Sequence, residues 1–242
     1  MLHTKAVSII FENDDFVAVN KSAGMLTIPD RHDETQLSLY TILLQQYGKI
    51  FIVHRLDRET SGLVLFAKNE VSHKYLSQLF EQRHIEKIYL GIIRGSLPAK
   101  KGFVNEPIAE HPLHKGVMTI SKKGKPSLTD YEVMEDYGIY SLVQFNIHSG
   151  RTHQIRVHMK FAGHPIACDT TYGDGKPIPL SSFKRKYKLS LHDEEESPLI
   201  NRLALHSHQL IFKDAGSKEH SLEAPLPKDI KALLQQLKKN RG

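Results

Sequence analysis

The chain has 242 residues, 40% of them hydrophobic, and its 33 basic and 27 acidic residues give a formal net charge of +6. This composition excludes a disordered protein, because the chain can bury a sizeable core. No apolar run is long enough to span a bilayer, the N-terminus lacks the apolar region of a signal peptide, and the single cysteine, Cys168, excludes an internal disulfide. We therefore expect a cytoplasmic protein without membrane attachment.

Hydrophobic periodicity predicts strands and helices along the first part of the chain. The predicted strands cover residues 7–11, 16–20, 50–53, 63–66 and 87–93, and the first two form a hairpin around the turn-rich residues 12–15. Apolar residues at helical spacing predict helices over residues 38–46 and 70–82.

The pattern is harder to interpret in the second part of the chain. Proline and glycine are frequent in residues 95–126, so we expect a loop-rich segment without long regular structure. Paired strands are predicted at 131–134 and 139–147, and a helix is favoured over a strand after Gln154. We expect an exposed insertion at 176–197 and a last helix at 227–239. Without a visible linker, these elements predict a single domain over residues 1–242, of the α+β class, with a mixed, mostly antiparallel central sheet and flanking helices and loops.

The most informative segment is His54-Arg-Leu-Asp57-Arg-Glu-Thr-Ser-Gly62, which lies between two predicted buried strands. It places the Asp57 carboxylate between the cations Arg55 and Arg58, which favour the charged form of the acid. A carboxylate held in this way can act as a nucleophile toward a sugar carbon or an electron-poor ring. The alternative is a structural ion pair that closes a loop, and the motif alone leaves it open.

A second polar segment, Ser149-Gly-Arg-Thr-His153-Gln-Ile-Arg156-Val-His158, lies further along the chain. Its two histidines are five positions apart, whereas helical metal sites usually space them by three or four, so we predict no metal site. The arginines can instead pair with a carboxylate or a phosphate. If Arg156 folds against Asp57, it keeps the acid charged and oriented, and spacing alone leaves a purely structural pairing equally open.

Basic residues gather at 115–125, 184–188 and 228–241. Such clusters can follow a phosphate backbone, although modestly basic surfaces also occur on proteins that bind no nucleic acid. Charge therefore makes RNA or DNA a reasonable partner, and three lysines of one loop, Lys122, Lys123 and Lys125, are candidates for contacts with its backbone.

Together, four segments resemble the successive motifs of the RluA-type RNA pseudouridine synthases. They are residues 54–62, 87–91 (Lys-Ile-Tyr-Leu-Gly), 150–158 and 202–206 (Arg-Leu-Ala-Leu-His), in the order of the family. The resemblance implies the catalytic fold of these enzymes. It also implies their reaction, which converts uridine in RNA to pseudouridine without a cofactor: the N1 glycosidic bond breaks, the uracil turns, and C5 joins C1′.

The resemblance also implies catalytic residues. Asp57 matches the catalytic aspartate, Tyr89 the tyrosine that lies against the target uracil, and Arg156 the basic residue paired with the aspartate. The sequence does not decide whether Asp57 attacks C1′ or the uracil ring.

Substrate contacts follow from the same resemblance. Arg55 matches the arginine that fills the space left by the flipped-out base, and Leu205 lies in the segment that closes the uracil pocket. We count His54 and Arg151 as further substrate-binding residues.

The implied partner is a ribosomal or transfer RNA, and we expect a monomer with no obligatory protein partner. Many relatives begin with a small RNA-binding domain, and because the first strand begins near Val7 we expect none here. Two other classes remain as alternatives. A non-catalytic RNA-binding module would tolerate the loss of Asp57. A metal-dependent hydrolase would need several convergent acids or histidines, and Asp57 has only Glu59 as an acidic neighbour.

Overall fold

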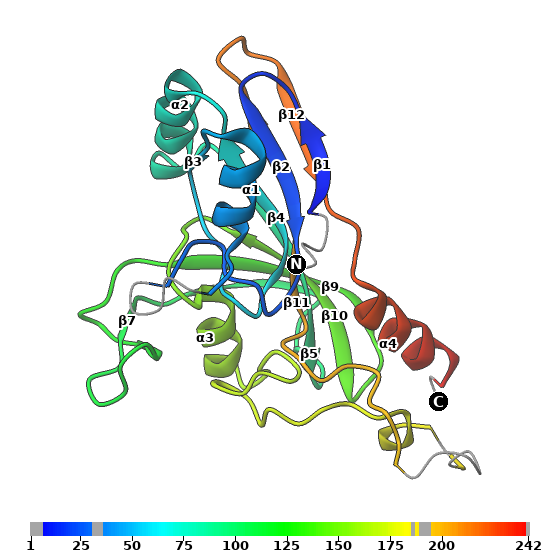
Figure 1. The fold of residues 1–242 in the computed structure, drawn as a ribbon. Helices are drawn as coiled ribbons and strands as arrows, with labels where there is room; N and C mark the ends of the chain where they lie inside the picture. The colour runs from blue at the N-terminus through cyan, green and yellow to red at the C-terminus, as the bar shows by residue number, and fades with distance from the viewer. Residues whose placement is uncertain (1–6, 31–35, 185–186, 189–194, 241–242) are drawn as a thin grey trace. The chain divides into compact units, whose positions relative to one another are not determined.

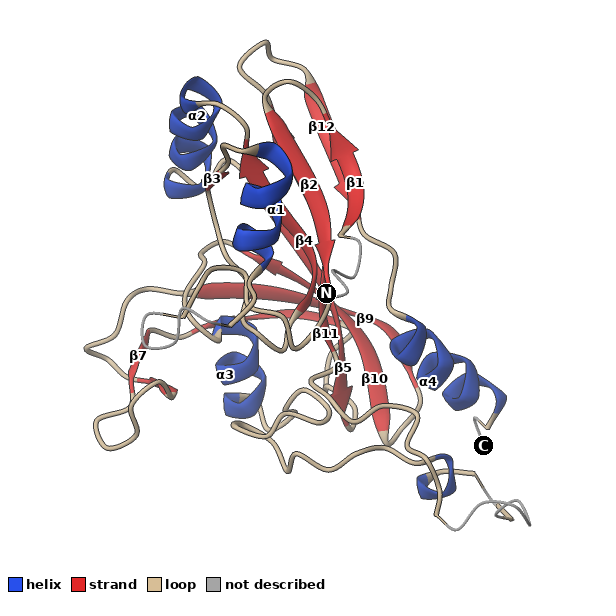
Figure 2. Ribbon diagram, in the orientation of Figure 1, coloured by secondary structure: helices blue, strands red, loops and turns tan. Residues whose placement is uncertain are grey.

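The computed structural model of the chain describes residues 7–30, 36–184, 187–188 and 195–240 (Figure 1). The chain divides into two compact units, the first of Met1–Tyr89 with His206–Pro225 and the second of Leu90–Leu205 with Leu226–Gly242. The single domain over residues 1–242 therefore stays a prediction. Strands dominate both units and helices are few (Figure 2), and most strand pairs are antiparallel, so the α+β class is confirmed.

The first unit contains a sheet in the order β1 (Ser8–Glu12), β2 (Phe16–Lys21), β4 (Ser61–Ala67) and β11 (Leu205–Lys213), with β3 (Phe51–Ile52) beside β4 and β12 (Glu219–Glu223) beside β11. Strand β4 pairs with β11 in parallel, whereas β1–β2, β2–β4, β3–β4 and β11–β12 are antiparallel. The predicted hairpin is confirmed, and so are the two strands around the Asp57 segment. The sequence patterns did not predict β11, because polar residues occupy both faces of its first half.

Both helices of the first unit begin at a capping side chain. Helix α1 (Leu39–Tyr47) follows Ser38, whose hydroxyl accepts a hydrogen bond from the N–H of Thr41 (3.1 Å), and α2 (Glu70–Glu81) follows Asn69, whose side chain accepts from the N–H of Ser72 (2.8 Å). Such caps satisfy N–H groups of the first helical turn. The predicted helices at 38–46 and 70–82 are confirmed. The apolar face of α2 joins a core that includes Phe16, Leu63, Leu65, Leu76, Leu79 and Phe212.

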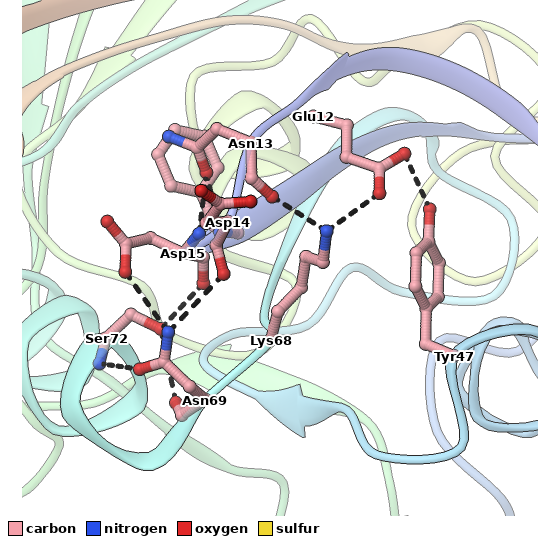
Figure 3. A network of polar contacts seen from close by, with 9 residues as sticks. Glu12, Asn13, Asp14, Asp15, Tyr47, Lys68, Asn69 and Ser72 are labelled. Atoms are coloured by element: carbon pink, nitrogen blue, oxygen red, sulfur yellow. Dashed lines mark hydrogen bonds and ion pairs between the residues drawn. The ribbon is translucent and has the colours of Figure 1, made fainter.

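A polar network at the far end of β4 fastens that strand to its neighbours (Figure 3). Lys68 Nζ donates to Glu12 Oε1 (2.8 Å) and to the carbonyl of Asn13 (2.8 Å), while the Tyr47 hydroxyl donates to Glu12 Oε2 (2.9 Å). The hydrogen bonds from Lys68 and Tyr47 lower the pKa of Glu12. The network therefore anchors the end of the strand into which the Asp57 segment leads.

The second unit contains the later part of β5 (Glu86–Arg94), followed in sheet order by β10 (Tyr140–Ile147), β9 (Leu128–Asp136) and β6 (Lys101–Asn105). Strands β7 (Ile108–Glu110) and β8 (Met118–Ile120) form a separate hairpin. Most of the segment 95–126 is loop, as expected, and β6, β7 and β8 are short strands within it. These strands are three to five residues long, and the prolines and glycines that suggested loops stand mainly between them.

Helix α3 (Gln154–Phe161) begins within one residue of the predicted start, so the helix favoured there is confirmed. The preceding residue, His153, has a left-handed backbone (φ 56°), which turns the chain into the helix. The Gln154 side chain donates to the carbonyl of Leu128 (2.9 Å) and accepts from the Ser149 hydroxyl (2.7 Å), so it ties the helix start to β9.

The last helix, α4 (Lys228–Lys239), matches the prediction for 227–239, and Ile230, Leu233 and Leu237 are its buried residues. The predicted insertion is described only in part. Residues 180–182 form a short 3-10 helix, Lys184 and Lys188 are exposed, and the basic residues between them, Arg185 and Lys186, lie outside the described residues. Across the described ranges, every helix is too short or too polar to cross a lipid bilayer.

Candidate active site

Asp57 lies in the first unit, in the turn between β3 and β4. The N–H of Thr60 donates to the Asp57 carbonyl (3.2 Å) and closes the turn. The preceding residue, Leu56, is buried, whereas Asp57 itself is half-buried. The backbone on both sides of Asp57 is thus held in place, and Asp57 itself keeps part of its surface exposed.

A loop after β2 clamps this turn from both sides. Before Asp57, the Thr27 hydroxyl donates to the Leu56 carbonyl (2.9 Å) and accepts from the Leu56 N–H (3.2 Å). After Asp57, Gly24 N–H donates to the Arg58 carbonyl (2.9 Å), and Arg58 Nε donates back to the Gly24 carbonyl (3.1 Å). Arg58 thereby gains a structural role that its sequence position did not reveal.

Lys21 supplies a buried cation to the same clamp. Its side chain is only 1% exposed, and Nζ donates to the carbonyls of Ser22 (3.1 Å), Met25 (2.8 Å) and Arg58 (3.0 Å). A buried charge needs such partners, because losing its hydration is costly. Sequence reasoning missed Lys21, although a lysine that ends an apolar strand is a usable signal.

Strand β11 passes close to the other end of the motif. In the parallel pairing of β4 with β11, Ser61 lies opposite His206 and Gly62 opposite Ser207. Gly62 has φ +115°, and a Cβ there would lie 2.1 Å from the Ser207 carbonyl oxygen. Ser61 Oγ and His206 Nδ1 form a hydrogen bond (2.9 Å). Only glycine fits at residue 62, so the first and last motif segments meet here.

Tyr89, the last residue of the first unit, lies near Asp57 and Ser207. It is 9% exposed. Burial raises the pKa of Tyr89 to about 12; the neighbouring Ser207 hydroxyl lowers it in part, and the negative charge of Asp57 raises it. The phenol therefore stays protonated at neutral pH. Two residues that the resemblance assigns to catalysis thus lie close enough to interact electrostatically.

His54 has a structural environment. Its Nε2 accepts a hydrogen bond from the N–H of Leu65 (2.9 Å), and its ring stacks on Phe80 at 4.3 Å between centroids. Burial lowers the pKa of His54 to about 3, and the positive charge of Lys87 contributes. The neutral imidazole holds the backbone of β4, and its assignment as a substrate contact stays a prediction.

Arg55 and Leu205 differ in exposure. Arg55 is exposed, and with the residues that the structure describes its guanidinium makes no hydrogen bond or ion pair, so it is available to a nucleic acid. Leu205, in the second unit, is 3% exposed, and its Cδ1 lies 3.2 Å from where a Cβ on Gly91 would be. Gly91 leaves the space that Leu205 occupies. Both assigned roles stay predictions.

Arg156, in the second unit, is held by a carboxylate that sequence reasoning missed. Its Nε and one terminal nitrogen donate to the two oxygens of Asp169 (2.8 and 2.9 Å), and the guanidinium lies 4.9 Å from the centre of the Tyr172 ring. Burial acts to raise the pKa of Asp169, but the bonds and charge of Arg156 outweigh it and lower that pKa. No spacing rule connects Arg156 to Asp169 in the sequence. The pairing of Arg156 with Asp57 would join the two units and stays a prediction.

The other polar residues of this segment have separate partners. Arg151 Nε donates to the carbonyl of Pro126 (3.4 Å), and its assignment as a substrate contact stays a prediction. His153 Nδ1 and the Tyr172 hydroxyl form a hydrogen bond (2.8 Å), whereas His158 bonds through its two nitrogens to the Thr129 hydroxyl and the Glu106 carbonyl. Within the described part of the chain, no three or more histidine, cysteine or acidic residues converge as metal ligands.

The loop lysines of the second unit are presented on a tight turn. Lys122, Lys123 and Lys125 are exposed, and none of them makes an ion pair with a residue that the structure describes. Gly124 N–H donates to the Ser121 carbonyl (2.8 Å), and Ile108 exchanges two backbone hydrogen bonds with Lys125. The turn is thus fixed to β7 while three positive charges face solvent.

Comparisons with known proteins agree with this geometry. The family model described as RNA pseudouridylate synthase matches residues 15–161. The chain is 34% identical over 238 residues to ribosomal large subunit pseudouridine synthase D of Nitrosomonas europaea, covering 96% of this chain and 65% of the relative. It is also 34% identical over 241 residues to synthase C of Escherichia coli, covering 96% and 70%.

A solved structure shows the same fold. Human RNA pseudouridylate synthase domain containing 4 superposes with a TM-score of 0.74 at 25% identity, over 96% of this chain and 93% of that chain. The chain spans 65 to 70% of the length of the two bacterial relatives named above. The chain belongs to the RNA pseudouridylate synthase family, and the resemblance of its motifs to the RluA type is confirmed.

Proposed function

We propose that the protein isomerises uridines in RNA to pseudouridine, with Asp57 as the nucleophile. The observation that carries the proposal is the Asp57 turn, clamped by Lys21 and Thr27 and lying beside Tyr89. Preorganisation of this kind is what a catalytic carboxylate requires. Family membership and the names of the relatives support the reaction class and favour ribosomal RNA, with transfer RNA as the second candidate.

The chemistry suits these residue types. The N1–C1′ bond breaks and a C5–C1′ bond forms; C5 then loses its proton, and N1 ends protonated. No electrons leave or enter the substrate, so the reaction needs no redox cofactor. Asp57 adds to C1′ or to the uracil ring at C6. The detached uracil carries negative charge, and the protonated Tyr89 phenol offers a stacking face and a neutral donor.

The target base must also leave its stack. Enzymes that react with a base inside folded RNA flip the nucleotide out, which costs unstacking energy. The exposed guanidinium of Arg55, two residues before Asp57, has the planar shape to stack in the vacated space.

Replacement of Asp57 tests the proposal directly. Asp57→Asn should leave folding and RNA binding intact, because Thr60 bonds to the backbone of residue 57, yet lower turnover by at least about a thousandfold. Glu59→Gln, in the same turn, is the matched control and should remain active. Tritium release from RNA labelled at C5 of uridine measures conversion, and turnover retained by Asp57→Asn would refute the role of Asp57. Pseudouridine mapping of ribosomal and transfer RNA from cells with and without the gene identifies the substrate.

The exposed lysines of the β8–β9 turn are proposed to contact the RNA backbone. Replacing Lys122, Lys123 and Lys125 together by glutamine should weaken binding and reduce the slope of log K against log salt by about 2, because each phosphate contact contributes about 0.7 to 0.9. The control replaces three exposed lysines of the first unit, Lys74, Lys213 and Lys218, with the same charge change. Equal salt slopes for the two triple variants would contradict the assignment.

A further inference from the structure

The hydroxyl of Ser207 is buried beside the Asp57 turn without an evident structural task. Ser207 lies on β11 and is 0% exposed, and its Oγ has no hydrogen-bond partner among the described residues. Buried hydroxyls are nearly always hydrogen-bonded, because an unmade bond costs folding free energy. Within the described residues, this is the single buried side-chain oxygen or nitrogen in that condition.

The backbone at Ser207 is firmly placed. Ser207 lies opposite Gly62 in the parallel pairing with β4, and its neighbour His206 bonds to Ser61 and to the carbonyl of Ala224 (3.2 Å). Successive side chains of a strand point to opposite faces, so the Ser207 hydroxyl points away from the face that His206 occupies. The unpartnered Ser207 hydroxyl is therefore held in a fixed place, where the first and last motif segments meet.

Tyr89 lies on β5, the strand beside β11 in sheet order, and its phenol is the group that the Ser207 hydroxyl reaches. The Ser207 hydroxyl lies near enough to the Tyr89 phenol to offset part of the effect of burial on its pKa, yet the two oxygens lack the geometry of a made hydrogen bond. Hydrogen bonds of catalytic groups are often poorly aligned until the substrate is in place. A serine has one donor hydrogen, and the phenol oxygen has lone pairs to receive it.

We propose that Ser207 is a positioning residue for Tyr89, and that its hydroxyl donates to the Tyr89 oxygen so that the phenol proton is directed toward the substrate beside Asp57. The inference rests on the proposed function and extends it to a residue outside the assigned roles. A phenol that accepts one hydrogen bond becomes a stronger donor in the next, since chained hydrogen bonds polarise each other.

The proposal predicts opposite effects on stability and on rate. Ser207→Ala removes an unpartnered buried hydroxyl, so the melting temperature should hold or rise, whereas the single-turnover rate should fall about three- to tenfold, the range expected for one neutral hydrogen bond. RNA affinity should not change. The matched control is Ser141, equally buried on β10, whose hydroxyl donates to the Gly95 carbonyl (2.8 Å). Ser141→Ala should lower the melting temperature and leave the rate unchanged.

A double-mutant cycle with Tyr89→Phe tests whether Ser207 acts on the rate through the Tyr89 hydroxyl. If Ser207 acts through the Tyr89 hydroxyl, the Ser207→Ala change should slow the wild type but not the Tyr89→Phe variant. The proposal is overturned if the Ser207→Ala rate equals that of the wild type, if the two effects multiply, or if Ser207→Ala loses as much thermal stability as Ser141→Ala. Absence of conversion by the wild type on ribosomal and transfer RNA would instead refute the proposed function, so the two failures are distinguishable.

Discussion

The half-buried imidazole of His54, stacked on Phe80, should limit the stability of the protein in acid. Burial, with a contribution from Lys87, lowers the pKa of His54 in the folded chain to about 3, against an ordinary value of 6.5. Between these values the unfolded chain binds a proton that the folded chain does not. The stability that depends on neutral His54 is therefore complete above pH 6.5 and is lost as the pH falls toward 3. His54→Gln keeps an acceptor for the Leu65 N–H and removes the titration.

The size of the effect follows from the pKa difference. Each pH unit below 6.5 costs about 1.36 kcal/mol, so His54 should lower the free energy of unfolding by about 2 kcal/mol between pH 8 and pH 5. Glu12 and Asp169 have lowered pKa values, but they titrate from ordinary values of 4.5 and 3.8 downward and contribute mainly below pH 5. Burial also lowers the pKa of His158. That contribution is the same in the wild type and in His54→Gln, so it cancels from the difference between them.

Urea unfolding at pH 8 and pH 5 measures the difference. The wild type and His84→Gln, which removes an exposed histidine, should each lose about 2 kcal/mol more on acidification than His54→Gln. An equal loss in His54→Gln and the wild type would refute the assignment of a neutral imidazole at His54. If His54→Gln keeps its stability at pH 8 but binds RNA more weakly, His54 contacts the substrate as the sequence suggested.

Two further substitutions test the packing of each unit. Gly62→Ala should destabilise the protein by about 3 kcal/mol or more, because its Cβ would meet the Ser207 carbonyl. The control, Gly138→Ala, has φ +80° but open space around it, and should cost only about 1 kcal/mol of left-handed backbone strain. Similar melting temperatures for the two variants would contradict this reasoning. Asp169→Asn removes the carboxylate charge from the buried pair with Arg156 and should cost about 3 to 5 kcal/mol in urea unfolding, and an unchanged midpoint would show that the pair contributes nothing to stability.

Much of the local structure was predictable because its causes are local. Ser38 and Asn69 cap the helices that follow them, and the spacing of apolar residues predicted both helices. Strands with a buried run, such as β2 and β4, also stood out. Strand β11 did not, because its pairing with β4 depends on close backbone approach at Gly62 and not on side-chain alternation. Short strands within 95–126 were hidden by the turn residues between them.

The sequence by itself determined the family, the candidate catalytic acid Asp57 and the turn in which Asp57 lies, since these depend on residue types at fixed short spacings. Only the tertiary structure decided what holds Asp57: Thr27 and Lys21 from a loop after β2, and a crossing with β11 at Gly62. It also showed that Arg156 pairs with Asp169, a carboxylate that the sequence did not indicate. Hydrogen bonds between residues far apart in the chain leave no periodicity in sequence, so they become visible only when the backbone brings the partners together.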